Sequence, residues 1–263
     1  MKIHVFPPSG RIVGIVALKN YLGLDCELQP IDLGRGDQRA PEYVSLNRNR
    51  KMPTLEDDGI VLWESNAILF YMASKRPERG VWPSDVKGQS DVLRWLFWES
   101  AHWDAESVGM VAYEKASKEV LGLGPPDSAF VARGEQNFSR FAAVLNDSLK
   151  GKTWVVGDRL TIADFSIGGL FPSAERMALP VGRFPEICPL VRGLGLPGCL
   201  AGGACDKRCR ASGVVRALYF QVGSRLSPKN VRWTRSRPAT VNRRSAPTSG
   251  KPARVHPLNR ACL

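Results

Sequence analysis

Two short segments on either side of a predicted hairpin constrain this chain more than any other feature. The first, Lys51–Leu55, places a proline at the start of an apolar stretch, and the second, Trp63–Leu69, places an acid and a serine before an apolar run. Because Pro53 has no backbone N–H, it belongs at the start or edge of a strand, and the Met52–Pro53 bond can be cis. A cis bond would turn the backbone groups of Met52 outward, where they are free to pair with an extended peptide.

The acid–serine pair is Glu64 and Ser65. Ser65 lies where a helix N-cap is expected, and the N–H groups and dipole of a helix N-terminus attract carboxylates. A strand edge and a helix start, brought together by one hairpin, predict a binding site for a small anionic peptide.

Hydrophobic periodicity predicts the order β-α-β-α-β-β-α for about the first 80 residues. Two strands joined through a helix predict a parallel pair, and Asp57-Asp58-Gly59 predicts a hairpin turn. From residue 86 onward the pattern is helical, with a capping box predicted at Thr161–Asp164 before an apolar helix. The predicted strands are 3–6, 26–33, 53–56 and 60–63, and the predicted helices are 11–22, 41–46, 65–75, 86–120 (one helix or a kinked pair), 127–149 and 165–177.

These motifs, in this order, resemble those of a bacterial-type cytosolic glutathione S-transferase over residues 1 to about 187. The resemblance implies an α/β thioredoxin-like domain over residues 1–80, which binds glutathione, and an all-α helical-bundle domain over residues 86–187, which is incomplete. It also implies an enzyme that conjugates the glutathione thiolate to an electrophilic small molecule, a role in detoxification, and a homodimer. A non-catalytic binding or interaction protein of the same fold is the alternative.

The same resemblance implies a role for each residue of the two segments. Glu64 faces the amino group of the γ-glutamyl end, and Ser65 with the helix start faces its carboxylate. The Met52 backbone before Pro53 pairs with the cysteinyl part, and Lys51 meets the glycyl carboxylate. Each feature also has an ordinary explanation, a surface helix cap or an edge-strand proline, but their joint occurrence favours the glutathione site.

Ser9, which follows the first strand and precedes the first helix, is the candidate catalytic residue. A hydroxyl and a helix N-terminus at this point can stabilise a thiolate. Ser9 resembles the catalytic serine of serine-type members of the family, whereas its alternative role is a simple N-cap. Similar proteins often carry a basic residue four positions later, where this chain has Val13, and Arg11 is a possible substitute. Tyr21, at the far end of the helix, is a weak rival.

The turn before Met52 departs from the family pattern. Residues 47–51 resemble Asn-Pro-x-Gly-Lys, with Arg48 in place of the proline and Arg50 in place of the glycine. If the glycine position takes a positive φ, Arg50 is strained there by about 1 kcal/mol. The two added charges can also attract an anionic ligand, and the sequence alone does not decide between these effects.

No metal site is predicted. His4, His102 and His256 are scattered, and Cys205 and Cys209 have no matching cysteine pair at zinc-site spacing. Glutathione, as a co-substrate, is therefore the only cofactor expected. A set of aromatic and histidine side chains near the expected cleft is assigned to the core and the subunit interface, with pocket lining as the lesser alternative: Trp95, Trp98, His102 and Trp103.

Charge divides the chain in two. Residues 1–187 carry 22 Lys and Arg against 24 Asp and Glu, whereas residues 188–263 carry 15 Lys and Arg against one acid, Asp206. This basic low-complexity tail is either a disordered extension, a nucleic-acid-binding arm or the product of a shifted reading frame, and the abrupt change in composition favours the last. Nucleic-acid binding is expected only non-specifically through the tail. Without an apolar run of about 18 residues or a signal peptide, we expect a cytoplasmic protein that does not enter membranes.

Overall fold

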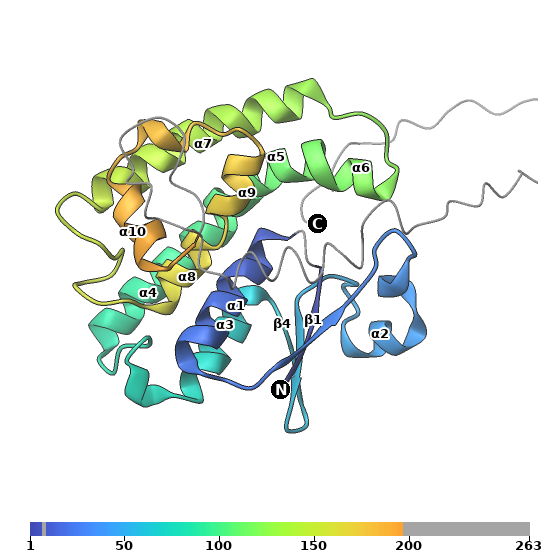
Figure 1. Ribbon diagram of the computed structural model, residues 1–263, viewed down its shortest axis with the longest axis horizontal. Helices are drawn as coiled ribbons and strands as arrows, with labels where there is room; N and C mark the ends of the chain where they lie inside the picture. The colour runs from blue at the N-terminus through green and yellow to red at the C-terminus, as the bar shows by residue number, and fades with distance from the viewer. Residues whose placement is uncertain (7–8, 197–263) are drawn as a thin grey trace, which may run out of the picture.

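The computed structural model describes residues 1–6 and 9–196 (Figure 1). Its sheet has the order β2-β1-β3-β4, formed by β1 (Lys2–Val5), β2 (Glu27–Pro30), β3 (Thr54–Asp57) and β4 (Ile60–Trp63). β1 and β2 are parallel, as predicted, and the other two pairs are antiparallel. The second strand is shorter than its predicted range of 26–33.

The first half of the chain has the expected helices α1 (Gly10–Leu22), α2 (Pro41–Leu46) and α3 (Ser65–Ser74). It also has two short 3-10 helices that were not predicted, η1 (Asp37–Arg39) and η2 (Pro77–Arg79). Gly23 ends α1 at a φ of 63°, a left-handed conformation that glycine adopts without a steric penalty. Together with the sheet, these elements form the predicted thioredoxin-like domain.

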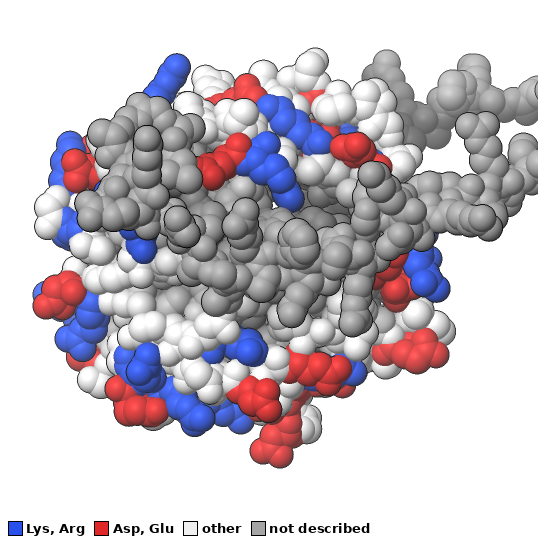
Figure 2. Space-filling model, in the orientation of Figure 1, with Lys and Arg blue, Asp and Glu red and all other residues white. Residues whose placement is uncertain are grey.

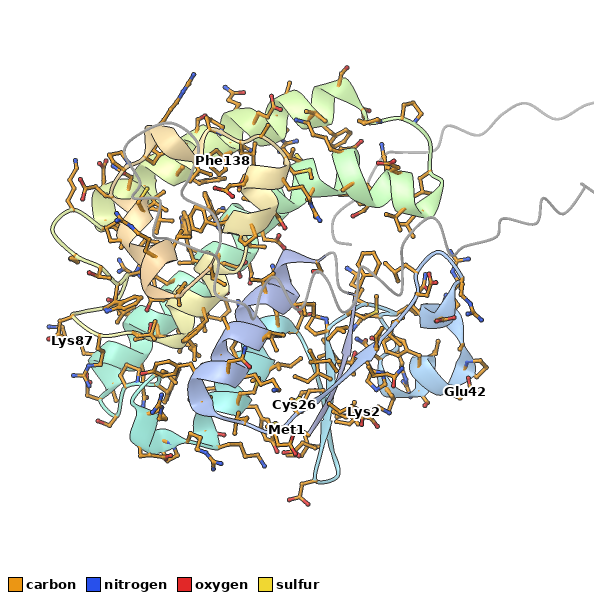
Figure 3. The ribbon with its side chains drawn as sticks, viewed as in Figure 1. Met1, Lys2, Cys26, Glu42, Lys87 and Phe138 are labelled. Atoms are coloured by element: carbon orange, nitrogen blue, oxygen red, sulfur yellow. The ribbon has the colours of Figure 1, made fainter. Side chains whose placement is uncertain are left out.

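The second half is helical throughout. One continuous run contains α4 (Val86–Trp98), the π-helical η3 (Glu99–Val108), α5 (Gly109–Ala112), the π-helical η4 (Tyr113–Ser117) and α6 (Lys118–Leu121). The later helices are α7 (Ser128–Ser148), α8 (Ile162–Gly168), α9 (Phe171–Arg176), η5 (Val181–Arg183) and α10 (Ile187–Gly193). Among these helices, Phe138 of α7 packs against the ring of Trp103 (Figure 3). None of the helices in the described part of the chain is long and apolar enough to cross a membrane.

Two features of the helical half differ from prediction. The single helix expected over 165–177 is two helices, α8 and α9, because Pro172 has no N–H with which to continue the ladder. Helical structure also extends past residue 187, since α10 buries Ile187, Leu190 and Val191. The predicted capping box is confirmed: the buried Asp164 accepts hydrogen bonds from the Thr161 N–H and hydroxyl. The tail from residue 197 lies outside the described residues.

The two halves meet along α1 and α3, which lie between the sheet and the helical bundle (Figure 1). A glycine sets the approach of α1 to α8: a Cβ on Gly14 would lie only 2.3 Å from the carbonyl oxygen of Phe165. This close packing fixes the start of α1 against the helical half, which matters for the site described below.

An ion cluster joins α3 to the end of the β3 strand. Asp57 accepts a hydrogen bond from the Tyr71 hydroxyl at 2.8 Å and pairs with the Lys75 ammonium at 2.8 Å. These contacts, led by the hydrogen bond from Lys75, lower the pKa of Asp57 to about 2. They hold α3, and with it Ser65, against the hairpin.

We predict that this cluster contributes an acid-sensitive part of the stability. Because the pKa of Asp57 is lower in the folded state than its ordinary value near 4, the contribution is complete above pH 4 and is lost as pH falls towards 2. Asp57→Asn should therefore lower the melting temperature at pH 7 but much less at pH 2. Asp158→Asn, at an exposed carboxyl in a loop, is the control. An equal loss at both pH values would contradict the prediction.

Candidate glutathione site

A buried hydrogen-bond network shapes the turn that precedes Met52. The carbonyl oxygen of Lys51 accepts hydrogen bonds from the Tyr43 hydroxyl and, at 2.9 Å, from the Asn47 amide. Asn47 also donates to the Thr54 hydroxyl at 3.0 Å, and Tyr43, Asn47 and Thr54 are all buried. The turn is thus held from beneath by side chains of α2 and β3.

The Met52–Pro53 peptide bond is cis, as the sequence allowed. Within the described residues, the Met52 N–H and C=O have no hydrogen-bond partner. An open pair of backbone groups at this place can bind an extended peptide in the manner of an added strand.

The start of α3 offers a second set of free donors. The helix begins at Ser65, with Glu64 at the N-cap position, so Ser65 is the first helical residue and not the predicted N-cap. The first intrahelical bond is from Ile68 N–H to the Glu64 carbonyl, which leaves the N–H groups of residues 65–67 without helical partners. Glu64 has a φ of 72°, an uncommon conformation for a residue with a side chain, and its side chain is exposed.

Arg11, from the first turn of α1, is the central side chain of the site. Its guanidinium donates to the Ser65 hydroxyl at 2.8 Å and to the Glu99 carboxylate at 3.2 Å. It also donates twice to the Asp104 carboxylate, at 2.9 and 2.6 Å. Arg11 therefore connects the start of α1, the start of α3 and the helical half.

The π-helical segment η3 explains how two carboxylates reach one guanidinium. Glu99 and Asp104 are five residues apart, a spacing that an α-helix directs to different faces. In a π-helix the repeating hydrogen bond joins residues five apart, so their side chains lie on the same face. Sequence analysis did not identify Glu99 or Asp104, because the helical pattern gives no signal for a π-helical turn.

Asn66 completes the connection between the halves. Its amide donates to the Glu99 carboxylate at 3.1 Å and to the Leu96 carbonyl at 3.1 Å, and its oxygen accepts from the Ser166 hydroxyl at 2.6 Å. Residues of α3, α4, η3 and α8 thus share one polar network directly behind Ser65.

The network contains several charged groups although most of it is buried. Burial raises the pKa of the Glu99 carboxyl, which is fully excluded from solvent, although the charge of Arg11 opposes that shift. Burial also works against the charged form of Arg11, but the carboxylates of Asp104 and Glu99 more than offset it and hold the pKa of Arg11 above its ordinary value. The guanidinium therefore remains charged, and the two acids depend on it.

Ser9 occupies the N-cap position of α1, but its side chain does not cap the helix. Among the described residues the Ser9 hydroxyl has no hydrogen-bond partner, and the residue is half-buried. Ser9 therefore has the N-cap position that its alternative role requires, but not the capping side-chain hydrogen bond. Arg11, two residues later, binds Ser65 and the two acids.

The remaining candidate residues lie elsewhere. His4 is buried and pairs with Glu56 at 2.6 Å. Trp95 and Trp103 belong to the core, whereas Trp98 and His102 line a groove of about 360 Å³ within the helical half. The other residues lining this groove are Glu106, Arg140, Phe141 and Val144.

Both halves of the chain match domains of known proteins. Residues 1–74 match the N-terminal domain of glutathione S-transferases, and residues 108–193 match the C-terminal domain. Glutathione S-transferase 3 of Zea mays is 31% identical over 165 residues, which cover 62% of this chain and 73% of that protein. The chain belongs to the glutathione S-transferase family.

Two further comparisons concern one member of the family. The transcriptional regulator URE2 of Saccharomyces cerevisiae is 30% identical over 220 residues, covering 70% of this chain and 61% of that protein. A solved structure of Ure2p in complex with glutathione has a TM-score of 0.64 at 23% identity and covers 73% of this chain and 92% of that one. The chain therefore shares its glutathione transferase fold with a protein whose name describes it as a transcriptional regulator.

We predict that Arg11→Met destabilises the protein by about 3 kcal/mol, because it leaves the buried Glu99 and the partly buried Asp104 without their cation. Denaturant unfolding measures the loss. Adding Glu99→Gln to the variant should recover part of it, because one uncompensated charge is removed. Arg133→Met, which changes an exposed arginine of α7, is the control. A loss below about 0.5 kcal/mol, as is usual for surface substitutions, would show that the cluster does not depend on Arg11.

Proposed function

We propose that this protein conjugates the thiolate of glutathione to an electrophilic small molecule, transferring an alkyl or aryl group. The observation that carries the proposal is the 2.8 Å bond between Arg11 and Ser65. It joins the start of α1, where Ser9 has a free hydroxyl, to the start of α3, where free N–H groups can bind a carboxylate. A thiol-activating group and an anion site thus lie on two adjoining helix ends.

Glutathione fits this arrangement as an extended peptide. Ser65 and the first turn of α3 bind the γ-glutamyl carboxylate, and the exposed Glu64 binds the amino group. The Met52 backbone pairs with the cysteinyl residue beside Pro53, and Lys51 meets the glycyl carboxylate.

The chemical step requires a thiolate near neutral pH, whereas an ordinary cysteine thiol has a pKa of about 8.5. The Ser9 hydroxyl donates a hydrogen bond to the thiolate sulfur, and the N-terminus of α1 adds a favourable dipole. The sulfur then attacks the electrophilic carbon, a carbon–sulfur bond forms, and the leaving group departs with its electron pair. We place the second substrate between the two halves, and the protein in the reducing cytoplasm, where glutathione is abundant.

Ser9→Ala should reduce kcat/KM with glutathione and an activated aryl chloride by about 10- to 100-fold, the value of one hydrogen bond to a charged atom. The affinity for glutathione should change little, and the thiol pKa of bound glutathione, followed by thiolate absorbance, should rise. Tyr21→Phe, at the other end of α1, is the control and should leave both unchanged. Unchanged activity in Ser9→Ala would remove Ser9 from the mechanism.

The second candidate is a non-catalytic binding protein, which the similarity to the regulator URE2 and the residue Val13 favour. A thermal melt of the purified chain, read together with turnover, separates the two candidates from each other. It also separates both from a chain that does not bind glutathione. A midpoint that rises with millimolar glutathione, together with turnover, supports the transferase. A rise without turnover of any electrophile supports the binding protein, and no rise contradicts both.

We also propose that two copies of the chain pair through the outer faces of α3 and α4. Phe70 of α3 and Phe97 of α4 are exposed large apolar side chains, 45% and 71% respectively, and Leu93 and Trp63 are also exposed. The bonds from Asn66 to Leu96 and Ser100 bring the start of α3 to the end of α4 and the beginning of η3. Apolar side chains gathered in this way mark a protein interface.

Phe97→Glu should therefore convert a dimer into a monomer, because it would bury a charge in an apolar contact. Light scattering after size-exclusion chromatography measures the mass. Leu123→Glu, an exposed apolar residue in the loop after α6, is the control and should remain dimeric. A monomeric wild-type protein would overturn this part of the proposal.

A further inference from the structure

The turn before Met52 carries a charge pattern that its motif lacks. Residues 47–51 contain three cations, Arg48, Arg50 and Lys51, and no acid. In the motif that this turn resembles, the positions of Arg48 and Arg50 hold an uncharged proline and glycine. Two of the three charges are therefore additions to that motif.

These cations have no acidic partner in the part of the chain that the structure describes. None of the three forms an ion pair within 4.0 Å with any described residue. The nearest acids along the chain are Glu56, which pairs with Lys2 and His4, and Glu42, an exposed residue at the start of α2 (Figure 3). On the face shown in Figure 2, the visible Lys and Arg are interspersed with Asp and Glu.

The turn is rigid enough to present its charges at fixed positions. The Asn47 carbonyl accepts from the Arg50 N–H at 2.9 Å, and the Asn47 side chain accepts from the Asn49 N–H at 3.0 Å. The buried contacts of Asn47 and Tyr43 to the Lys51 carbonyl hold the other end. A charge on a preorganised turn binds a ligand with less loss of entropy than one on a mobile loop.

Arg50 is kept at a conformational cost. Its φ is 58°, in the left-handed region, where a residue with a Cβ is less stable than glycine by about 1 kcal/mol. Among the described residues its side chain makes no hydrogen bond or ion pair that would offset this cost. The Arg50 side chain therefore does not stabilise the described fold through polar contacts. A role in binding a ligand would account for its presence.

We infer that the turn Arg48–Lys51 selects the C-terminal residue of the thiol tripeptide. The inference rests on the proposed function, in which Lys51 meets the glycyl carboxylate of glutathione. One cation suffices for that single carboxylate, and Arg48 and Arg50 remain for further negative charge. The site favours a γ-glutamyl-cysteinyl peptide whose last residue carries a second carboxylate, such as glutamate, over glutathione itself.

The expected size of the preference for the second carboxylate follows from the solvent exposure of the ion pairs that it would form with the two arginines. An exposed ion pair contributes about 0.2–1 kcal/mol, so two arginines around one added carboxylate give about a three- to tenfold gain in affinity. Because all these charges are in contact with solvent, salt should reduce the gain. A preference of this kind changes with ionic strength, whereas one due to pocket shape does not.

Calorimetric titration of the full chain with three peptides tests the inference. The peptides are γ-glutamyl-cysteinyl-glutamate, glutathione, and the glutathione ester blocked at the glycyl carboxylate. We expect affinity to fall in that order at low salt, and the gap between the first two to shrink at high salt. Arg48→Gln combined with Arg50→Gly should close that gap but keep the gap between glutathione and its ester, which depends on Lys51.

Two controls keep the result interpretable. Arg133→Gln removes an exposed cation on α7 and should leave all three affinities unchanged. The double variant should also melt at a higher temperature than the wild-type chain, because Arg50→Gly relieves the strain at positive φ; this would show that the variant folds while its selectivity is lost. Equal affinity of the wild-type chain for the first two peptides, or a gap that survives in the double variant, overturns the inference and leaves glutathione binding intact. Failure to bind glutathione at all overturns the proposed function, and this inference with it.

Discussion

The contact of one guanidinium with two carboxylates holds this molecule together at its functional centre. Arg11 lies where α1, α3 and the π-helical segment η3 meet, and it neutralises charge on Glu99 and Asp104 that the helical half could not bury alone. A buried ion cluster of this kind contributes little net stability compared with an apolar core, but it admits few alternative arrangements. It therefore fixes the position of Ser65 relative to the start of α1.

The consequence is that the proposed glutathione site depends on both halves of the chain. The groups expected to touch glutathione, from Ser9 to Ser65, all come from the first half. The position of Ser65, however, is determined through Arg11 and Asn66 by residues of η3 and α8. The close packing of Gly14 against Phe165 limits the same interface to one separation. Damage to the helical half should thus reach the site without changing any residue within it.

Whether a feature of the structure could be predicted depends on whether its sequence signal is local. The order of elements along the chain, the parallel pair and the capping box at Thr161 depend on local patterns and were predicted, and Pro53 allowed the cis bond that the structure has. The break at Pro172 was missed because the apolar pattern continues across it, although the proline itself was a usable signal. Glu99 and Asp104 were missed for a deeper reason, since their shared face exists only in a π-helical turn.

The departures from the family motif show how local strain and function can be separated. Arg50 adopts the left-handed conformation that its motif position requires, so the fold tolerates the residue that the pattern excludes. The turn keeps its shape because Tyr43, Asn47 and Thr54 hold it from the buried side, independently of the side chains at positions 48 and 50. Those two positions are therefore free to vary in charge at a cost of about 1 kcal/mol, small against a domain stability of about 5–15 kcal/mol. A surface whose shape is set from beneath can change its ligand preference without changing its fold.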